Sequence, residues 1–286
     1  MAKWYNASKK IGQVGGSVFY IDKGQVIERS RAAVVRNPRT IAQQTQRVKW
    51  SNIVHFWGAS SRSFDKGFIA KKPTQSYYNA FMGLNLGVEP INFPKDYADM
   101  KASVVAPYII SSGNLPPISA SKPDSTAILS SLEIGLGSIT SLGNLSQRII
   151  QYNDNWMNGD KLCVFVFRQL MADSGYPFME VYRDSIVLDI ASTATIQNWS
   201  VRGLRFLAYA NEEVSTFTDI AGVAFVHTRK NNGVLTCSTQ SVVMTSNYYL
   251  DFVGPEALAR ALASYNAKDH EFLEPVYGAE EHHIII

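Results

Sequence analysis

The chain has 286 residues, of which 46% are hydrophobic and 12% aromatic, and its formal net charge is +3. This length and apolar content allow one large domain or two ordinary ones with a sizeable core. No run approaches the roughly 18 apolar residues of a membrane-spanning helix, and no apolar signal-peptide segment follows the first lysine. We therefore expect a soluble protein, made in a cytoplasm, with no membrane partner.

Positive charge is concentrated at the start of the chain. Ten Lys/Arg and two Asp/Glu give +8 in residues 1–50, whereas seventeen Lys/Arg and twenty-two Asp/Glu give −5 in residues 51–286. A basic segment favours an acidic protein surface or nucleic acid as its partner, and a merely solvated basic face is the alternative. The candidate partner-contacting residues of this segment are Arg29, Arg31, Arg36, Arg39, Arg47 and Lys49.

The opening segment has the pattern of a β-hairpin followed by a helix. Residues 18–21 and 25–29 are strand-like and flank a turn with Gly24, which takes positive φ at little steric cost. Asn37 followed by Pro38 predicts the start of a helix that reaches Trp57. An isolated hairpin is marginal in water. The unit therefore needs a partner, which is either the rest of the chain or a neighbouring subunit.

The middle of the chain predicts a second helix and then an irregular region. The helix opens near Thr74, contains aromatic residues at 77, 78 and 81 that we expect in the core, and stops at Gly87. Residues 102–111 predict an edge strand, because Pro107 interrupts them. Residues 112–146 are rich in Ser, Gly and Pro and predict a flexible connection or a set of short strands.

The second half predicts a series of short antiparallel strands. They are expected within 162–167, 179–190, 204–210, 222–228 and 234–244, with an Asn-Gly hairpin turn at 232–233 and a helix from Gly254. The predicted fold class is α+β: an N-terminal β-hairpin with helices, followed by an antiparallel β-sandwich (Ig-like). The corresponding domains are 1–100, 101–253, and a C-terminal helix and tail, 254–286.

The residues show no catalytic signature. Neither a Ser-His-Asp nor a Cys-His arrangement is visible, and Asp154, Asp160, Asp184 and Asp189 are typical of turns and surfaces. Cys163 and Cys237 lie in apolar runs and are expected to be buried free thiols. The adjacent His282 and His283 point in opposite directions in an extended segment, which argues against a shared metal ion. We therefore expect no enzyme activity, no cofactor and no metal.

Short motifs extend over most of the chain and carry a family resemblance. They are Gly-x-x-Gly-Gly-Ser-Val-x-Tyr from Gly12, Gly-Gln-Val-Ile-x-Arg from Gly24, Asn-Pro-Arg-Thr-x-x-Gln-x-x-x-Arg from Asn37, Asn-Ala-Phe from Asn79, Trp-x-x-Gly-Asp from Trp156, and Ser-Thr-Gln from Ser238. This series resembles an uncharacterised family of Bacteroidetes bacteria and their phages, with related virion structural proteins in crAss-like phages. The resemblance implies a virion component of the neck or tail.

The expected function is structural. The chain would be a repeated subunit of a head–tail connector (neck) or tail ring, located in the virion and contacting copies of itself, other neck or tail proteins, or the portal. The alternative is a nucleic-acid-binding protein that uses the basic cluster.

The last residues are the second candidate interface. Residues 267–286 hold one Lys and five Asp/Glu, giving −4, and they end with an acidic pair and three isoleucines. We expect this tail to dock on a neighbouring subunit, and a tail folded back on its own subunit is the alternative. The interface residues proposed here are Glu280, Glu281, Ile284, Ile285 and Ile286.

Overall fold

The structure is a computed structural model that describes residues 3–6, 9–22, 25–31, 39–64, 68–88, 90–121, 129–134, 139–195, 200–201, 204–205 and 220–266. The chain divides into two compact units, one formed by residues 1–41 with 267–286 and the other by residues 42–266. We call the part within residues 1–41 the arm and residues 42–266 the main unit. The division into three domains, 1–100, 101–253 and 254–286, stays a prediction from the sequence.

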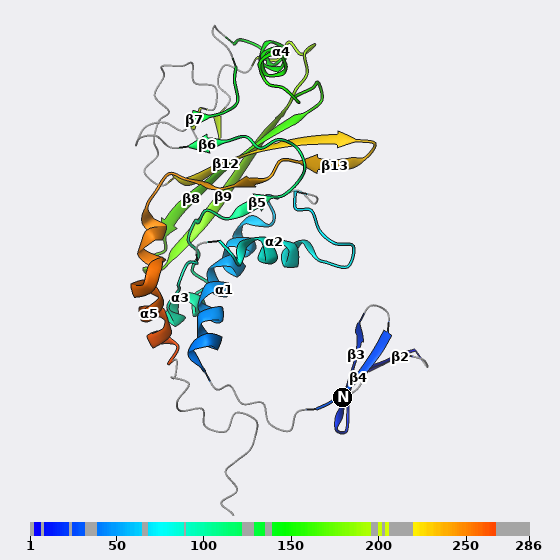
Figure 1. Cartoon of the computed structure of the whole chain (residues 1–286), viewed down its shortest axis with the longest axis vertical. Helices are drawn as coiled ribbons and strands as arrows, with labels where there is room; N and C mark the ends of the chain where they lie inside the picture. Colours follow the sequence, from blue (N-terminus) through cyan, green and yellow to red (C-terminus); the bar gives the residue numbers. More distant parts are fainter. Residues whose placement is uncertain are drawn as a thin grey trace, which may run out of the picture. The chain divides into compact units, whose positions relative to one another are not determined.

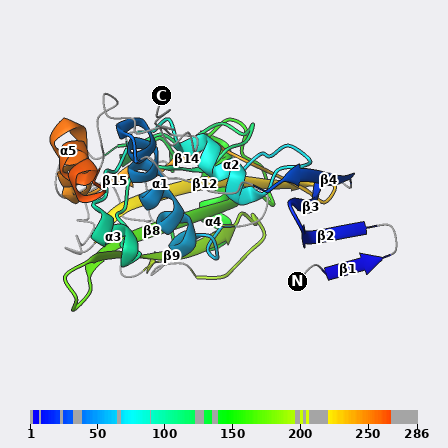
Figure 2. The ribbon, with the colours of Figure 1, turned by 90° about the horizontal axis from the view of Figure 1, so that it is seen from below.

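The arm contains one antiparallel sheet (Figures 1 and 2). Its strands are β1 (Lys3–Asn6), β2 (Lys9–Val14), β3 (Ser17–Asp22) and β4 (Gln25–Ser30), and they neighbour one another in that order. The β3–β4 pair is the predicted hairpin, and β1 and β2 extend it. Gly15, in the turn between β2 and β3, has a φ of 56°, which favours glycine.

Helix α1 (Ile41–Ser60) begins later than the sequence indicated. Arg39 has a φ of 52°, which is incompatible with a right-handed helix, so the first helical residue follows it. Asn37 and Pro38, the predicted start, lie outside the described residues. The helix continues past Trp57 to Ser60, whose hydroxyl donates to the carbonyl of Phe56 at 2.7 Å.

The main unit is built on a five-stranded antiparallel sheet. Strands β13 (Val234–Cys237), β12 (Ile220–Asn231), β8 (Lys161–Met171) and β9 (Pro177–Val187) neighbour one another in that order, and β15 (Val243–Met244) also pairs with β12. The predicted Asn-Gly turn connects β12 and β13. Asn232 and Gly233 have φ values of 49° and 82°, the positive pair that a type I′ hairpin turn requires.

Shorter elements surround this sheet. They are α2 (Tyr77–Asn85), α3 (Lys95–Asp99), β5 (Ile109–Ser111), β6 (Ala120–Ser121), β7 (Leu129–Ser130), α4 (Leu142–Tyr152), β10 (Ser200–Val201), β11 (Leu204–Arg205), β14 (Gln240–Ser241), the 3-10 helix η1 (Tyr248–Phe252) and α5 (Gly254–Ser264). The α+β class, with an N-terminal hairpin, helices and sandwich-like antiparallel sheets, is confirmed. Helix α4 was not predicted, and of the expected strand at 102–111 only β5 forms.

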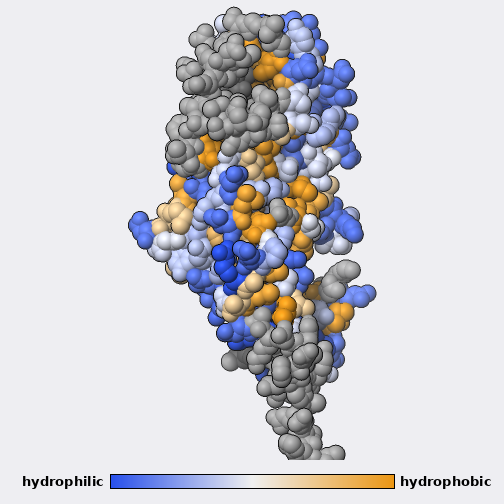
Figure 3. Space-filling model, turned by 60° about the vertical axis from the view of Figure 1, so that its left-hand side comes forward, coloured by the Kyte–Doolittle hydropathy of each residue, from blue (hydrophilic) through white to orange (hydrophobic). Residues whose placement is uncertain are grey.

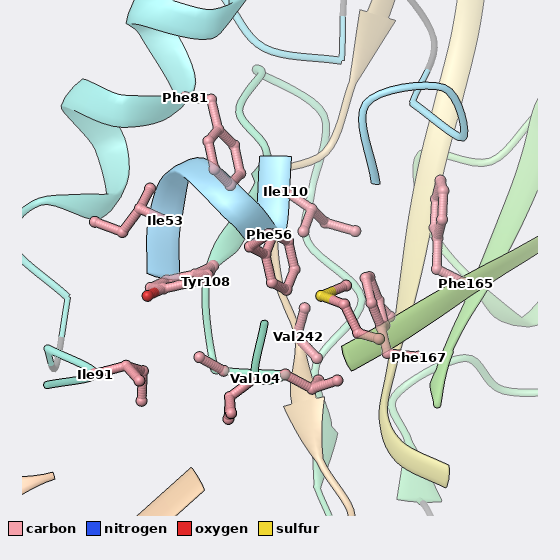
Figure 4. Close-up of a cluster of buried hydrophobic side chains, with 14 of the residues drawn as sticks. Ile53, Phe56, Phe81, Ile91, Val104, Tyr108, Ile110, Phe165, Phe167 and Val242 are labelled. Atoms are coloured by element: carbon pink, nitrogen blue, oxygen red, sulfur yellow. The ribbon is translucent and has the colours of Figure 1, made fainter. Parts of the chain in front are cut away.

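Aromatic side chains fill the core between α1, α2 and the sheet (Figure 4). The Phe56 ring of α1 lies 5.6 Å from Phe167 of β8 and 5.0 Å from Tyr108, centroid to centroid. Phe81 of α2 is fully buried, as the sequence predicted. The Asn52 amide donates to the Tyr108 hydroxyl at 3.1 Å, which satisfies a polar group inside this apolar core. None of the helices in the described ranges is long and apolar enough to cross a membrane.

Candidate interaction surface

The arm sheet carries apolar side chains on both of its faces. In the β3–β4 register Tyr20 lies opposite Ile27, and the next pair, Ile21 opposite Val26, points to the other face because side chains alternate along a strand. Antiparallel sheets usually pack one face on a core and leave the other to water. The arm sheet, with apolar pairs on both faces, departs from this pattern.

These apolar pairs are open to solvent within the single chain. The exposed fractions of Tyr20, Ile21 and Val26 are 41%, 38% and 39%, and Ile27 is only half-buried. No side chain that the structure describes in strands β2 to β4 is buried. Because a sheet gains its stability mainly by burying a face, this exposure makes the arm sheet the candidate interaction surface.

Exposed apolar residues also occur on the main unit. Trp50 of α1 is 41% exposed and Val234 of β13 is 64% exposed. On the face drawn in Figure 3, hydrophobic residues are interspersed with hydrophilic ones. Such scattered residues are normal on a protein surface. The arm differs because its exposed apolar residues sit in adjacent pairs on a sheet that has no buried side chain among those described.

Two of the predicted basic residues frame this surface. The Arg29 guanidinium lies 5.9 Å from the Tyr20 ring centroid, so a positive charge lies beside an exposed aromatic side chain. The Arg31 backbone N–H donates to the Gly16 carbonyl at 2.6 Å, which fixes the chain directly after β4. Residues 1–41 contain eight Lys/Arg and two Asp/Glu, a net charge of +6. Positive charge and exposed apolar side chains therefore occur together in the arm.

The structure distributes the other predicted residues over two units. Arg39 is exposed within the arm, whereas Arg47 and Lys49 lie on α1 of the main unit. Arg36 lies outside the described residues, as do all five interface residues predicted in the tail. The basic cluster of the sequence is thus divided between two units.

The positive charge of Arg47 acts on Tyr265 of its own unit. Burial raises the pKa of Tyr265, the negative charges of Asp99 and Asp96 raise it further, and the positive charge of Arg47 opposes them. Arg47, Asp96 and Asp99 are therefore each close enough to Tyr265 to affect its ionisation.

A buried ion cluster at the start of β8 was missed by the sequence reasoning. Asp160 is 1% exposed, so its assignment to a turn surface is wrong. Its carboxylate oxygens accept hydrogen bonds from Arg229 Nε and Nη2, both at 2.7 Å, and His227 Nε2 lies 2.8 Å from Oδ2. The Trp-x-x-Gly-Asp motif from Trp156 was the available signal, because it places an aromatic residue and a carboxylate at one turn.

The charge states of this cluster follow from its contacts. Burial opposes ionisation of Asp160, but hydrogen bonds from Arg229, the Met157 N–H and His227 outweigh it, so the Asp160 pKa is lowered. Burial also lowers the pKa of His227, although Asp160 acts in the opposite direction. The neutral His227 ring donates from Nε2 to the carboxylate and stacks on Trp156, with centroids 3.8 Å apart.

The geometry around His227 fits a structural role. Ser238 accepts a hydrogen bond at 3.1 Å from the backbone N–H of His227, not from its ring. The Asp160 carboxylate is held by Arg229, whose Nη2 also donates to the Asn155 carbonyl. The cluster therefore ties the loop before β8 to strand β12. Within the described ranges, no group of three or more His, Cys, Asp or Glu could hold a metal ion.

Both cysteines are free and buried, as predicted. Burial raises the pKa of the Cys237 thiol to about 11, and its Sγ donates to the Phe68 carbonyl at 3.1 Å. A protonated thiol of this kind is a poor nucleophile. Cys237 therefore acts as a core residue.

Comparison with protein-family models matched part of the chain. Residues 6–137, less than half of the chain, match a family of unknown function (DUF6266). The match includes the strands β2, β3 and β4 of the arm and the helices α1, α2 and α3. Comparisons with curated proteins and with solved structures gave no match. The link to phage virion proteins stays a prediction from the sequence motifs.

Proposed function

We propose that this protein is a structural subunit of a phage virion, repeated in a head–tail connector (neck) or tail ring. The observation that carries the proposal is the arm sheet, which exposes the Tyr20–Ile27 pair on one face and the Ile21–Val26 pair on the other. The motif resemblance supplies the phage setting. The position along the virion and contacts with neck, tail or portal proteins belong to the same proposal.

The energetics favour assembly through the arm. Full burial of each such side chain contributes about 1.5–3 kcal/mol before the cost of ordering. Four half-buried or exposed apolar residues can therefore stabilise a contact between subunits by several times the thermal energy. A heterologous contact between the arm of one copy and another part of the next closes into a ring when the rotation permits.

The test compares the mass of the native assembly with that of an arm variant. Wild-type protein should form a high-order oligomer, measured by light scattering over a range of concentrations. Tyr20→Ser combined with Val26→Ser should shift it towards monomer by removing one apolar side chain from each face. Val234→Ser is the matched control, because Val234 is more exposed than either residue but lies in the main unit.

Each possible result of this comparison either supports or contradicts the proposal. Loss of the oligomer in the arm variant, with the control unchanged, supports the proposal. A wild-type protein that stays monomeric at every concentration contradicts it, and so does an arm variant that assembles like the wild type.

A further inference from the structure

Strand β4 is an open edge of the arm sheet. The sheet has the order β1-β2-β3-β4, and within the described ranges no strand pairs with the outer side of β4. An open edge presents unpaired backbone N–H and C=O groups, which an extended segment of another chain can satisfy. Along this edge Val26 and Ile27 lie near the start of β4, and Arg29 lies near its end after the acidic Glu28. Arg31 follows just beyond the strand.

We propose that residues 280–286 of a second copy of the chain add to β4 as an antiparallel fifth strand. This inference rests on the proposed function, because it needs a repeated subunit. It names the partner of the arm: an extended, acidic and isoleucine-rich segment.

The spacing of residues in the two segments is complementary. In β4 the apolar pair comes two to five residues before the basic residues Arg29 and Arg31. In the tail the acidic pair Glu280 and Glu281 comes three to six residues before the three isoleucines. Antiparallel pairing therefore sets the isoleucines beside Val26 and Ile27 and the glutamates beside the arginines. Parallel pairing would set glutamates beside the apolar pair and isoleucines beside the arginines.

The run of three isoleucines matches a sheet with two apolar faces. Successive side chains of a strand alternate, so Ile284 and Ile286 would extend one apolar row and Ile285 the other. Tyr20 with Ile27 and Ile21 with Val26 already form these two rows. β-branched residues also suit an extended strand. The added strand thus explains why both faces of the arm are apolar at this edge.

The charges of the two segments agree with this pairing. Residues 1–41 carry +6, and residues 267–286 carry −4 from one Lys and five Asp/Glu. Opposite charges raise the association rate and select the register, in a manner that salt weakens.

The experiment reverses the charges on each side of the contact. One variant carries Arg29→Glu and Arg31→Glu, and the other carries Glu280→Arg and Glu281→Arg. Each alone should lose assembly, because like charges then face each other. An equimolar mixture should regain it, since the arm of each variant matches the tail of the other in an alternating ring. Lys72→Glu with Lys230→Glu, two exposed residues of the main unit, is the matched control.

The mixture distinguishes a tail that binds a second copy from a tail that binds the arm of its own chain. Recovery of assembly in the mixture supports the proposal, provided that both variants have the circular dichroism of the folded wild type. Recovery only in a chain carrying all four substitutions would show docking within one chain and overturn it. Assembly of either variant alone, or no recovery in any combination, also overturns it while leaving the oligomeric function standing. A monomeric wild type overturns the proposed function itself.

Discussion

Arg229 holds Asp160 in a two-pronged salt bridge, with Nε and Nη2 each 2.7 Å from one carboxylate oxygen. This pair joins strand β12 to the turn before β8, and it lies beside the buried His227 ring. A carboxylate with 1% exposure depends on such partners, because burial alone penalises its charge.

Asp160→Asn should destabilise the main unit strongly. The substitution leaves Arg229 without its charge partner, and breaking a buried pair from one side costs about 3–5 kcal/mol. The measurement is the free energy of unfolding in urea. Asp154→Asn, at an exposed position in the same loop, is the control and should change it by less than about 0.5 kcal/mol. Equal effects of the two substitutions would show that the cluster does not stabilise the fold.

Acidification should weaken the fold through His227. Its pKa in the folded protein lies below the ordinary 6.5, so the unfolded chain takes up the proton first as the pH falls. The stabilisation is therefore complete above pH 6.5 and declines as the pH drops towards the folded pKa. His227→Gln should flatten the pH profile of urea unfolding in this range. His55, whose pKa burial also lowers, remains in both proteins and cancels in the comparison.

Asp160 adds a second pH dependence at lower pH. Its folded pKa lies below 3.8, so its stabilisation is present above that value and is lost as the pH falls through the folded pKa. In Asp160→Asn the acid limb of the urea profile below pH 4 should become shallower than in the wild type. An unchanged acid limb would show that folding does not lower the pKa of Asp160.

Phe56→Ala should strongly destabilise the main unit, because it removes a ring from the aromatic core. Phe56 is fully buried between Phe167 and Tyr108, and removing a buried aromatic ring typically costs about 3–5 kcal/mol. Trp50→Ala on the same helix is the control, because Trp50 is 41% exposed. The midpoint of thermal unfolding should fall by far more for Phe56→Ala. A larger fall for Trp50→Ala would contradict the packing described here.

Two glycine substitutions should have opposite effects. A Cβ at Gly113 would clash with the backbone carbonyl of Cys237 and lie 2.8 Å from its Sγ, whereas a Cβ at Gly83 meets nothing within 4 Å. Gly113→Ala should therefore destabilise by about 1–3 kcal/mol. Gly83→Ala lies inside helix α2 and should stabilise by about 0.5–1 kcal/mol. Urea unfolding of the two variants checks both signs.

The strand pairings show what the sequence could predict and what it could not. The turn at Asn232 and Gly233 was predictable, because the residue types that allow positive φ are local. The contact between Asp160 and His227 joins residues 67 positions apart, and only the pairing of β8 with β12 brings them together. Strand β2 escaped prediction because Lys9 and Lys10 interrupt any regular apolar alternation.

The candidate interface was likewise only partly predictable from the sequence. The basic residues were predictable as a cluster in the sequence, yet Arg29 belongs to the arm and Arg47 to the main unit. Neighbours in sequence can face different partners, because helix α1 begins between them. The exposure of both arm faces required the structure, since the apolar pattern of Tyr20 and Ile21 is equally compatible with a buried strand.

Binding to duplex DNA should be weak and steeply dependent on salt. Contacts between exposed Arg or Lys and phosphates release counterions, so such binding weakens steeply as salt rises. Filter binding at increasing salt concentrations measures the affinity. Tight binding that survives moderate salt, and that Arg29→Glu with Arg31→Glu abolishes, would favour the nucleic-acid alternative.

The mass of the wild-type particle in solution tests the central claim most directly. Mass photometry over a wide range of protein concentrations should show one closed, high-order oligomer of the 31.8 kDa chain, at a discrete multiple of that mass. A single 31.8 kDa species at every concentration would contradict a ring-forming subunit.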